Sequence, residues 1–218
     1  MNKLYIITGP AGVGKSTISY EVGKKLKKSV VIEGDTIYNF FVGGRIKPWY
    51  KDAPLDLFWN NCIMLIKSYL EAGYDVVFNY IISNKNLDRL KETFKDYEII
   101  FRCLLVDEET IIKRDLLRPE DCQMHERSII LLNEFKKYNY DRKYIIDSSN
   151  LTIEETVEEV LNGNNWIWRQ ISRRCKRFVN WIRRIYCVNR WRQTRPCPSR
   201  VSWKNGTTWF RRSTKKFW

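Results

Sequence analysis

The chain contains 218 residues, with 39 lysines and arginines against 25 aspartates and glutamates, for a formal net charge of +14. This length fits one domain, or one domain with an appendage, and suffices for a hydrophobic core without disulfide or metal crosslinks. Hydrophobic residues make up 44 % of the chain, which excludes a fully disordered protein. No run approaches eighteen apolar residues, so we expect no membrane-spanning helix.

Short apolar strands alternate with amphipathic helices through the first part of the chain. We expect strands over residues 4–8, 29–33, 75–82, 97–106 and 143–146. Helices are expected over residues 16–28, 55–72, 87–94, 107–118 and 126–137, with a last one that begins at Thr152. Asp107 is placed to cap one helix, and Thr152 with Glu155 to form a capping box at another. The alternation predicts an α/β fold with a five-stranded, mainly parallel sheet and helices on both faces.

The positive charge is confined to the end of the chain. Residues 1–162 carry 23 basic and all 25 acidic side chains, a net charge of −2, whereas residues 163–218 carry 16 basic side chains and no acidic one. We therefore expect a folded body over residues 1–162 and a separate basic tail over residues 163–218. The average charge is no evidence that the body binds nucleic acid.

A phosphate loop joins the first strand to the first helix. Residues 9–16 fit the Walker A pattern G-x-x-x-x-G-K-[ST] in that structural context. Glycines let successive backbone N–H groups turn toward a phosphate, and the start of the helix adds its positive end. We expect Lys15 to reach the β- and γ-phosphates and the Ser16 hydroxyl to bind Mg²⁺. The residues expected to bind the nucleotide are Gly9, Pro10, Ala11, Gly12, Val13, Gly14, Lys15, Ser16 and Thr17.

Other charged residues are expected near the same edge of the sheet. Asp35 follows the second strand, where it could accept a proton from an acceptor hydroxyl or hold Mg²⁺ through water; the alternative is a helix cap. Arg114 and Arg118 are spaced to share one helical face, and Arg127 lies just beyond the next loop. With Lys15 they could neutralise a transferring phosphoryl group. The alternative for the three arginines is surface salt bridging with neighbouring carboxylates.

The segment 40–54 is irregular and leaves two interpretations open. Arg45, Lys47 and Trp49 could line a pocket for the phosphate acceptor. Alternatively, Trp49 is a packing anchor and the two cations are solvated.

The body resembles small bacterial P-loop kinases of the kind described as gluconate kinases or AAA-type P-loop kinases. It is more distantly similar to chloramphenicol phosphotransferase and shikimate kinase. The resemblance rests on residues 7–17, 32–35, 114–118 and 147–149 and covers residues 1–162. It implies ATP and Mg²⁺ as cofactors, a lid around residues 114–127, Asp35 near the acceptor hydroxyl, and an adenine-side contact at Ser148. Asn79 departs from relatives that place an acid at the end of this strand, and residues 36–55 match no sugar-acid kinase motif, so gluconate is not predicted as the substrate.

Cysteine usage bears on the compartment. The six cysteines form no C-x-x-C pair, and only five residues separate Met1-Asn2-Lys3 from Gly9, too few for the core of a signal peptide. We therefore expect reduced thiols in a cytoplasmic protein.

The tail differs sharply from the body in composition. Residues 163–218 hold seven of nine tryptophans and 12 arginines against 4 lysines, whereas the body holds 7 arginines against 16 lysines. This contrast favours a change of reading frame or a fused foreign segment. The competing hypothesis is functional: apolar residues recur at helical spacing from Trp168 to Ile185, and such a helix could contact an anionic membrane or nucleic acid.

Two functions remain open from the sequence. The first is an ATP-dependent phosphotransferase that moves a phosphoryl group to a hydroxyl of a small molecule. The second is an ATPase or nucleotide-binding switch that the tail tethers to membrane or nucleic acid. The sequence defines neither the acceptor nor the oligomeric state.

Overall fold

The structure is a computed structural model that describes residues 2–138 and 140–162, apart from the side chain at position 121. The basic tail, including the helix expected from Trp168 to Ile185, lies outside the described residues.

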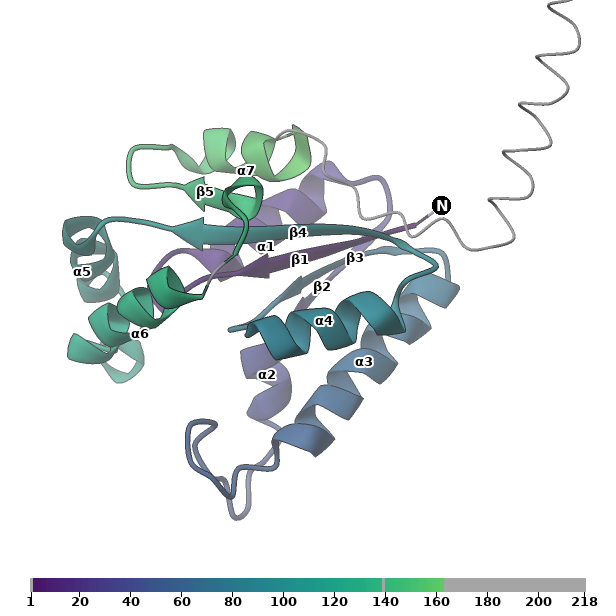
Figure 1. The fold of residues 1–218 in the computed structure, drawn as a ribbon, viewed down its shortest axis with the longest axis horizontal. Coiled ribbons are helices and arrows are strands. Elements are labelled where there is room, and N and C mark those ends of the chain that lie inside the picture. The colour runs from purple at the N-terminus through teal and green to yellow at the C-terminus, as the bar shows by residue number, and fades with distance from the viewer. Residues whose placement is uncertain (1, 139, 163–218) are drawn as a thin grey trace, which may run out of the picture. The chain divides into compact units, whose positions relative to one another are not determined.

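A five-stranded parallel sheet forms the centre of the body (Figure 1). Its strands are β1 (Lys3–Thr8), β2 (Ser29–Glu33), β3 (Asp75–Asn79), β4 (Glu98–Leu105) and β5 (Ile145–Asp147). They are arranged in the order β2-β3-β1-β4-β5, and every neighbouring pair is parallel. The predicted parallel α/β sheet is confirmed, and the N-terminal strand lies at its middle.

Helices cover both faces of the sheet, as predicted. In Figure 1, α1 and α7 lie on one face and α3 and α4 on the other, while α5 and α6 lie beyond the carboxyl ends of the strands. The helices are α1 (Lys15–Lys25), α2 (Gly34–Tyr38), α3 (Leu55–Glu71), α4 (Asn84–Thr93), α5 (Glu108–Leu116), α6 (Glu126–Lys137) and α7 (Ile153–Asn162). Short 3₁₀ turns occupy Glu120–Cys122 and Arg142–Tyr144.

Two hydrophobic cores follow from the alternation of side chains along each strand. In β1, Leu4 and Ile6 pack toward α3 and α4, whereas Tyr5 and Ile7 pack toward α1 and α7. Side chains of neighbouring residues in a strand point to opposite faces, so a strand buried on both sides must be apolar throughout. Each such buried side chain stabilises the fold by roughly 1.5–3 kcal/mol.

The predicted helix caps are present. Asp107 accepts a hydrogen bond from the Thr110 amide at 2.7 Å, at the start of α5. At α7, Thr152 and Glu155 exchange the two hydrogen bonds of a capping box, at 2.9 and 3.1 Å. Each cap satisfies backbone N–H groups that the helix itself cannot, and contributes about 1 kcal/mol.

Several elements differ from the sequence prediction: α1 ends at Lys25 instead of residue 28, and α4 begins at Asn84 instead of residue 87. A short helix, α2, begins directly after β2, where no helix range was predicted. Gly34 makes this turn possible, because a Cβ there would lie 2.4 Å from Cδ2 of Tyr80. Strand β3 ends at Asn79 instead of Ile82, because the Ile82 amide donates to the Thr8 side chain at 3.0 Å and leaves the ladder.

Candidate active site

The phosphate loop depends on three glycines with positive φ. Gly9, Gly12 and Gly14 have φ angles of 150°, 84° and 100°, which other residues rarely adopt. A Cβ on Gly9 would also lie 2.4 Å from the carbonyl oxygen of Leu104 on β4. The loop therefore lies tightly against the neighbouring strand, and its backbone shape is accessible only to glycine at these positions.

The loop leads into the N-terminus of α1, which has no side-chain cap. Gly14 is the N-cap residue and offers no side-chain acceptor to the first-turn N–H groups. These groups carry the positive end of the helix dipole. An eleven-residue helix that starts in a glycine loop is a favourable place for an anion.

Lys15 is a nearly buried cation at this helix start. Its side chain is 9 % exposed, and Nζ donates to the Pro10 carbonyl oxygen at 2.9 Å. Burial lowers the pKa of Lys15 from its ordinary value of 10.5 to about 8; the Asp35 carboxylate opposes this shift, and Arg118 adds to it. Because burial is the main cause, the lowered pKa reports a desolvated ammonium group, which an anion such as phosphate placed beside it would stabilise.

One cavity of about 1120 Å³ brings the predicted site residues together. It lies at the carboxyl ends of the strands, where ligands of open α/β sheets bind. Of the predicted residues, its lining includes Ala11, Gly12, Val13, Gly14, Lys15, Ser16, Thr17, Asp35, Arg114, Arg118, Arg127 and Ser148, but not Gly9 or Pro10. Gly9 allows the loop to pack closely against Leu104 of β4, and the Pro10 carbonyl accepts the hydrogen bond from Lys15.

Asp35 lies in the first turn of α2, exposed to the cavity. The N-cap of α2 is Glu33, so the expectation that Asp35 caps a helix does not describe its position. Its charge acts on Lys15, and it is the second cause, after burial, of the raised pKa of Tyr80. An exposed carboxylate within electrostatic reach of the phosphate-loop lysine is placed to accept a proton from a bound hydroxyl.

Arg114, on α5, forms hydrogen bonds with two other segments of the chain. It donates to the Val13 carbonyl at 2.9 Å and to the Ser148 carbonyl at 2.8 Å. The phosphate loop, α5 and the segment after β5 are therefore connected through one guanidinium group.

The other two arginines have carboxylate partners: the salt-bridge alternative named the partner of Arg118 but not that of Arg127. Arg118 pairs with Asp115 at 3.2 Å, and Arg127 pairs with Glu134 at 3.8 Å. The inference that Arg114 and Arg118 share a helical face was wrong, because α5 ends at Leu116. Pro119 disfavours helical backbone at the residue before it, so Arg118 lies in the following loop.

Asp115 is a site residue that sequence reasoning treated only as a surface partner. It is 2 % exposed, and its carboxylate accepts from the backbone amides of Met124 and His125 at 2.9 and 2.7 Å. It therefore holds the loop after α5 as well as Arg118. Its signal in the sequence is its spacing of four from the buried Ile111, which places a carboxylate on the inward face of the helix.

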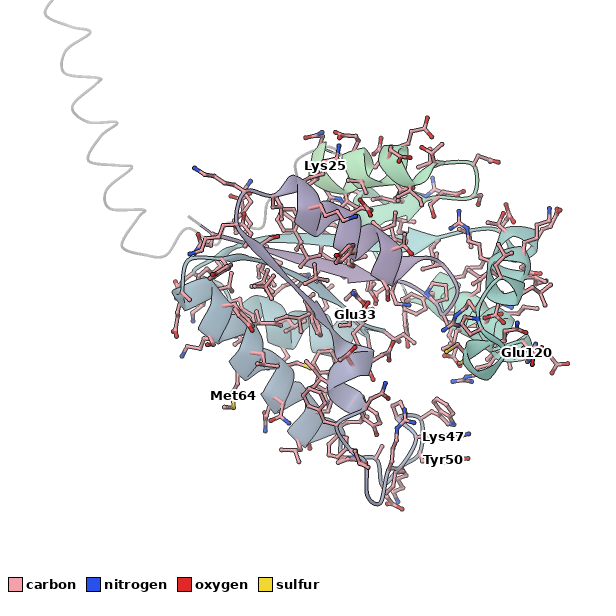
Figure 2. All side chains as sticks on the ribbon, turned by 180° about the vertical axis from the view of Figure 1, so that it is seen from behind. Lys25, Glu33, Lys47, Tyr50, Met64 and Glu120 are labelled. Carbon is pink, nitrogen blue, oxygen red and sulfur yellow. The ribbon has the colours of Figure 1, made fainter. Side chains whose placement is uncertain are left out.

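The segment between α2 and α3 forms another wall of the cavity, with Arg45, Lys47 and Trp49 among its lining residues. Figure 2 shows Lys47 and Tyr50 near each other on this segment. Trp49 is 53 % exposed, so the interpretation as a packing anchor is wrong, whereas Arg45 and Lys47 are exposed to solvent, as the same alternative expected. The Trp49 ring is instead available to a ligand.

Ser16 and Asn79 bear on the expected Mg²⁺ site. The Ser16 side chain is exposed where it lines the cavity. Asn79 is 2 % exposed at the end of β3, and its Nδ2 has no hydrogen-bond partner within the described part of the chain. Asn79 does not line the cavity, so the exposed Ser16 hydroxyl is the residue of this pair that fits an oxygen-ligated cation there.

Comparison with known proteins identifies the fold. No protein-family model and no curated protein sequence matches the chain. Solved structures match well: the tunicamycin resistance protein of Deinococcus radiodurans is 18% identical, covers 77% of this chain and 98% of its own, and has a TM-score of 0.53. A gluconokinase from Sinorhizobium meliloti 1021 is 18% identical, covers 82% and 97%, and has a TM-score of 0.52.

Shikimate kinase from Bacteroides thetaiotaomicron is also 18% identical, with coverage of 73% and 98% and a TM-score of 0.52. Identities of this size show the fold alone: the body has the fold of P-loop kinases, as the sequence resemblance implied. Among the described residues, no helix is both long enough and apolar enough to cross a bilayer.

Proposed function

We propose that the protein is an ATP-dependent phosphotransferase that moves the γ-phosphoryl group to a hydroxyl of a small molecule. The observation that carries the proposal is the placement of the buried Lys15 and the exposed Asp35 in one cavity, where the Asp35 carboxylate raises the pKa of Lys15 against the effect of burial. The first is suited to the phosphoryl group and the second to the hydroxyl that attacks it.

In this proposal the phosphate loop binds the triphosphate of ATP. The first-turn amides of α1 and Lys15 contact the phosphate oxygens, and the Ser16 hydroxyl is the protein ligand for Mg²⁺. Bound Mg²⁺ supplies charge neutralisation between the β- and γ-phosphates. Ser148 and Arg114, joined by their 2.8 Å hydrogen bond, form the wall assigned to the adenosine end.

The transfer step needs only positioning and electrostatics. The acceptor oxygen attacks the γ-phosphorus, the bond between that phosphorus and the β,γ-bridging oxygen breaks, and ADP leaves. Asp35 takes the proton of the hydroxyl. Lys15, Arg114, Arg118 and Arg127 stabilise the charge that develops on the phosphoryl oxygens.

The test is transfer from γ-labelled ATP into a cell metabolite extract by the full chain, with Lys15→Ala as the control. We expect label in a small metabolite, lost in the control, with the mass of the product identifying the acceptor. Label that appears only as inorganic phosphate, in a Lys15-dependent manner, would instead establish the ATPase or switch.

The compartment and the tail complete the proposal. The described thiols are free, with Cys62 and Cys103 buried and Cys122 exposed, which supports a reducing cytoplasm. We propose that residues 163–218 are an appendage outside the kinase fold. If it is functional, the full chain should bind anionic vesicles or single-stranded DNA more tightly than a chain ending at Asn162; equal binding would favour a frame-shifted or foreign segment, which sequencing the gene in independent isolates would check.

A further inference from the structure

The wall formed by Arg45, Lys47 and Trp49, here called the acceptor wall, lies in the segment between α2 and α3 and lines the cavity together with Asp35. If the phosphate loop takes ATP, this wall faces the second substrate. Its chemistry therefore defines what that substrate must carry besides its hydroxyl.

Buried contacts hold the acceptor wall in place. Tyr38 is 2 % exposed, its ring packs against Phe41 and Phe58, and its hydroxyl donates to the Ile46 carbonyl at 2.7 Å. Arg45 donates to the Asn39 side chain at 2.8 Å. Ile46, which lies between Arg45 and Lys47, is thus hydrogen-bonded to the core. This contact fixes the position of the segment that carries the two cationic residues.

The acceptor wall carries positive charge that no carboxylate neutralises. Neither Arg45 nor Lys47 forms an ion pair within residues 2–138 and 140–162. Residues 163–218 contain no acidic side chain that could serve them. Two cations in a cavity wall favour an anionic group on the ligand.

Trp49 adds a flat apolar surface beside these cations. Lys47 Nζ lies 5.4 Å from the centroid of its ring, and Cζ of Arg127 lies 5.6 Å from it. These distances are at the long end for cation–π contacts, and the side chain remains 53 % exposed. The exposed indole can therefore stack on a flat ring of a ligand. Stacking of this kind contributes strongly to the binding of nucleotides, whichever base they carry.

We propose that the acceptor is a hydroxyl compound that carries both an anionic group and a flat ring, the combination found in a nucleoside monophosphate. The inference rests on the proposed phosphotransferase function and extends it to the class of acceptor. Arg45 and Lys47 bind the anion, Trp49 stacks on the ring, and the free hydroxyl points to Asp35. The reaction consumes one ATP, forms one phosphoester on that hydroxyl and releases ADP.

The experiment measures binding first and transfer second. The full chain is saturated with Mg²⁺ and a non-hydrolysable ATP analogue, so that the probe cannot occupy the adenosine side, and uridine 3′-monophosphate is titrated by calorimetry. Uridine lacks the anion, glycerol 3-phosphate lacks the ring, and gluconate is a flexible hydroxy acid. We expect uridine 3′-monophosphate to bind at least about tenfold more tightly than each of the three.

Variants connect that binding to the acceptor wall. Arg45→Ala and Lys47→Ala should each weaken it about five- to tenfold, and Trp49→Ala about tenfold. Lys51→Ala is the matched control, because Lys51 is exposed on the same segment but does not line the cavity. Absence of binding, equal binding of gluconate, or equal loss in the control variant would each overturn the inference.

Label transfer separates the two proposals. Label from γ-labelled ATP on the 5′-hydroxyl of the probe supports both. Tight binding that depends on the acceptor wall, with release of inorganic phosphate alone, would support the proposed ligand class and refute the phosphotransferase. Transfer to a neutral or ring-free acceptor would support the phosphotransferase and refute the proposed acceptor class.

Discussion

Lys15 should make the free protein less stable than it would be with an apolar side chain at the same position. The pKa of Lys15 is lowered from 10.5 to about 8 because the ammonium group is buried. At about 1.4 kcal/mol per pKa unit, keeping this charge inside the fold costs roughly 3–4 kcal/mol. Lys15→Met keeps the length of the side chain and removes the charge, so we expect a gain of that size at pH 7, or about 7–14 °C in Tm.

The pH dependence tests the cause of this effect. Below the folded pKa of about 8 the lysine is charged in both states, so the whole cost is present. Between that pH and 10.5 the folded protein loses the proton first, the cost fades, and wild type and variant should become equally stable. The assay is urea unfolding of the two full chains followed by far-ultraviolet circular dichroism at pH 7, 9 and 10.5.

Lys25→Met is the control for this comparison. Lys25 lies on the same helix, is 57% exposed and pairs with Glu158 at only 3.9 Å, so its replacement should change stability by less than about 0.5 kcal/mol. The variant Lys15→Met should also lose the stabilisation that Mg·ATP gives to wild type. A Lys15→Met protein that is less stable at pH 7, or whose difference from wild type is the same at every pH, would refute the reasoning.

Three further substitutions test the site. Asp35→Asn removes the proton acceptor and should lower transfer at least about 100-fold while ATP affinity in a binding titration is unchanged; normal transfer would show that another group takes the proton. Asp115→Asn should cost about 1–3 kcal/mol in urea unfolding and increase hydrogen exchange at the two backbone amides that it holds, and unchanged exchange would contradict its positioning role. Gly9→Ala should destabilise the fold by about 2–3 kcal/mol, because the added Cβ would lie 2.4 Å from the Leu104 carbonyl oxygen. Gly43→Ala is the control, because no atom lies within 4 Å of its added Cβ and its Tm should be unchanged. Similar Tm values for the two variants in a thermal melt would count against this account.

The sequence predicts the sheet well for a physical reason. Strands that are covered on both faces must be apolar throughout, and turn residues bound them, so all five were found and the phosphate loop could be placed between β1 and α1. The motif also indicated that Asp35 and the three arginines should lie at the edge of the sheet formed by the carboxyl ends of the strands. These predictions rest on local pattern, which the sequence displays directly.

The remaining features depend on contacts between distant residues. Helix α2 is too short to show a period, and the contact that shapes its start joins Gly34 to Tyr80. The role of Asp115 could not be predicted, because its partners include backbone amides. Every residue type except proline carries such an amide, so the sequence does not show which ones a carboxylate will bind. The exposure of Trp49 could not be predicted either, because an aromatic residue in an irregular stretch is as compatible with packing as with binding.

Arg114 has a consequence for the order in which the protein matures during synthesis. The loop that begins at Gly9 leaves the ribosome before the strands that pair with β1, as the pairing of Leu4 with Val76 and Ile99 requires. The hydrogen bond from Arg114 to the Ser148 carbonyl forms later still, because Ser148 lies near the end of the body. A nascent chain therefore carries its phosphate loop long before the contacts that complete the cavity around it can form.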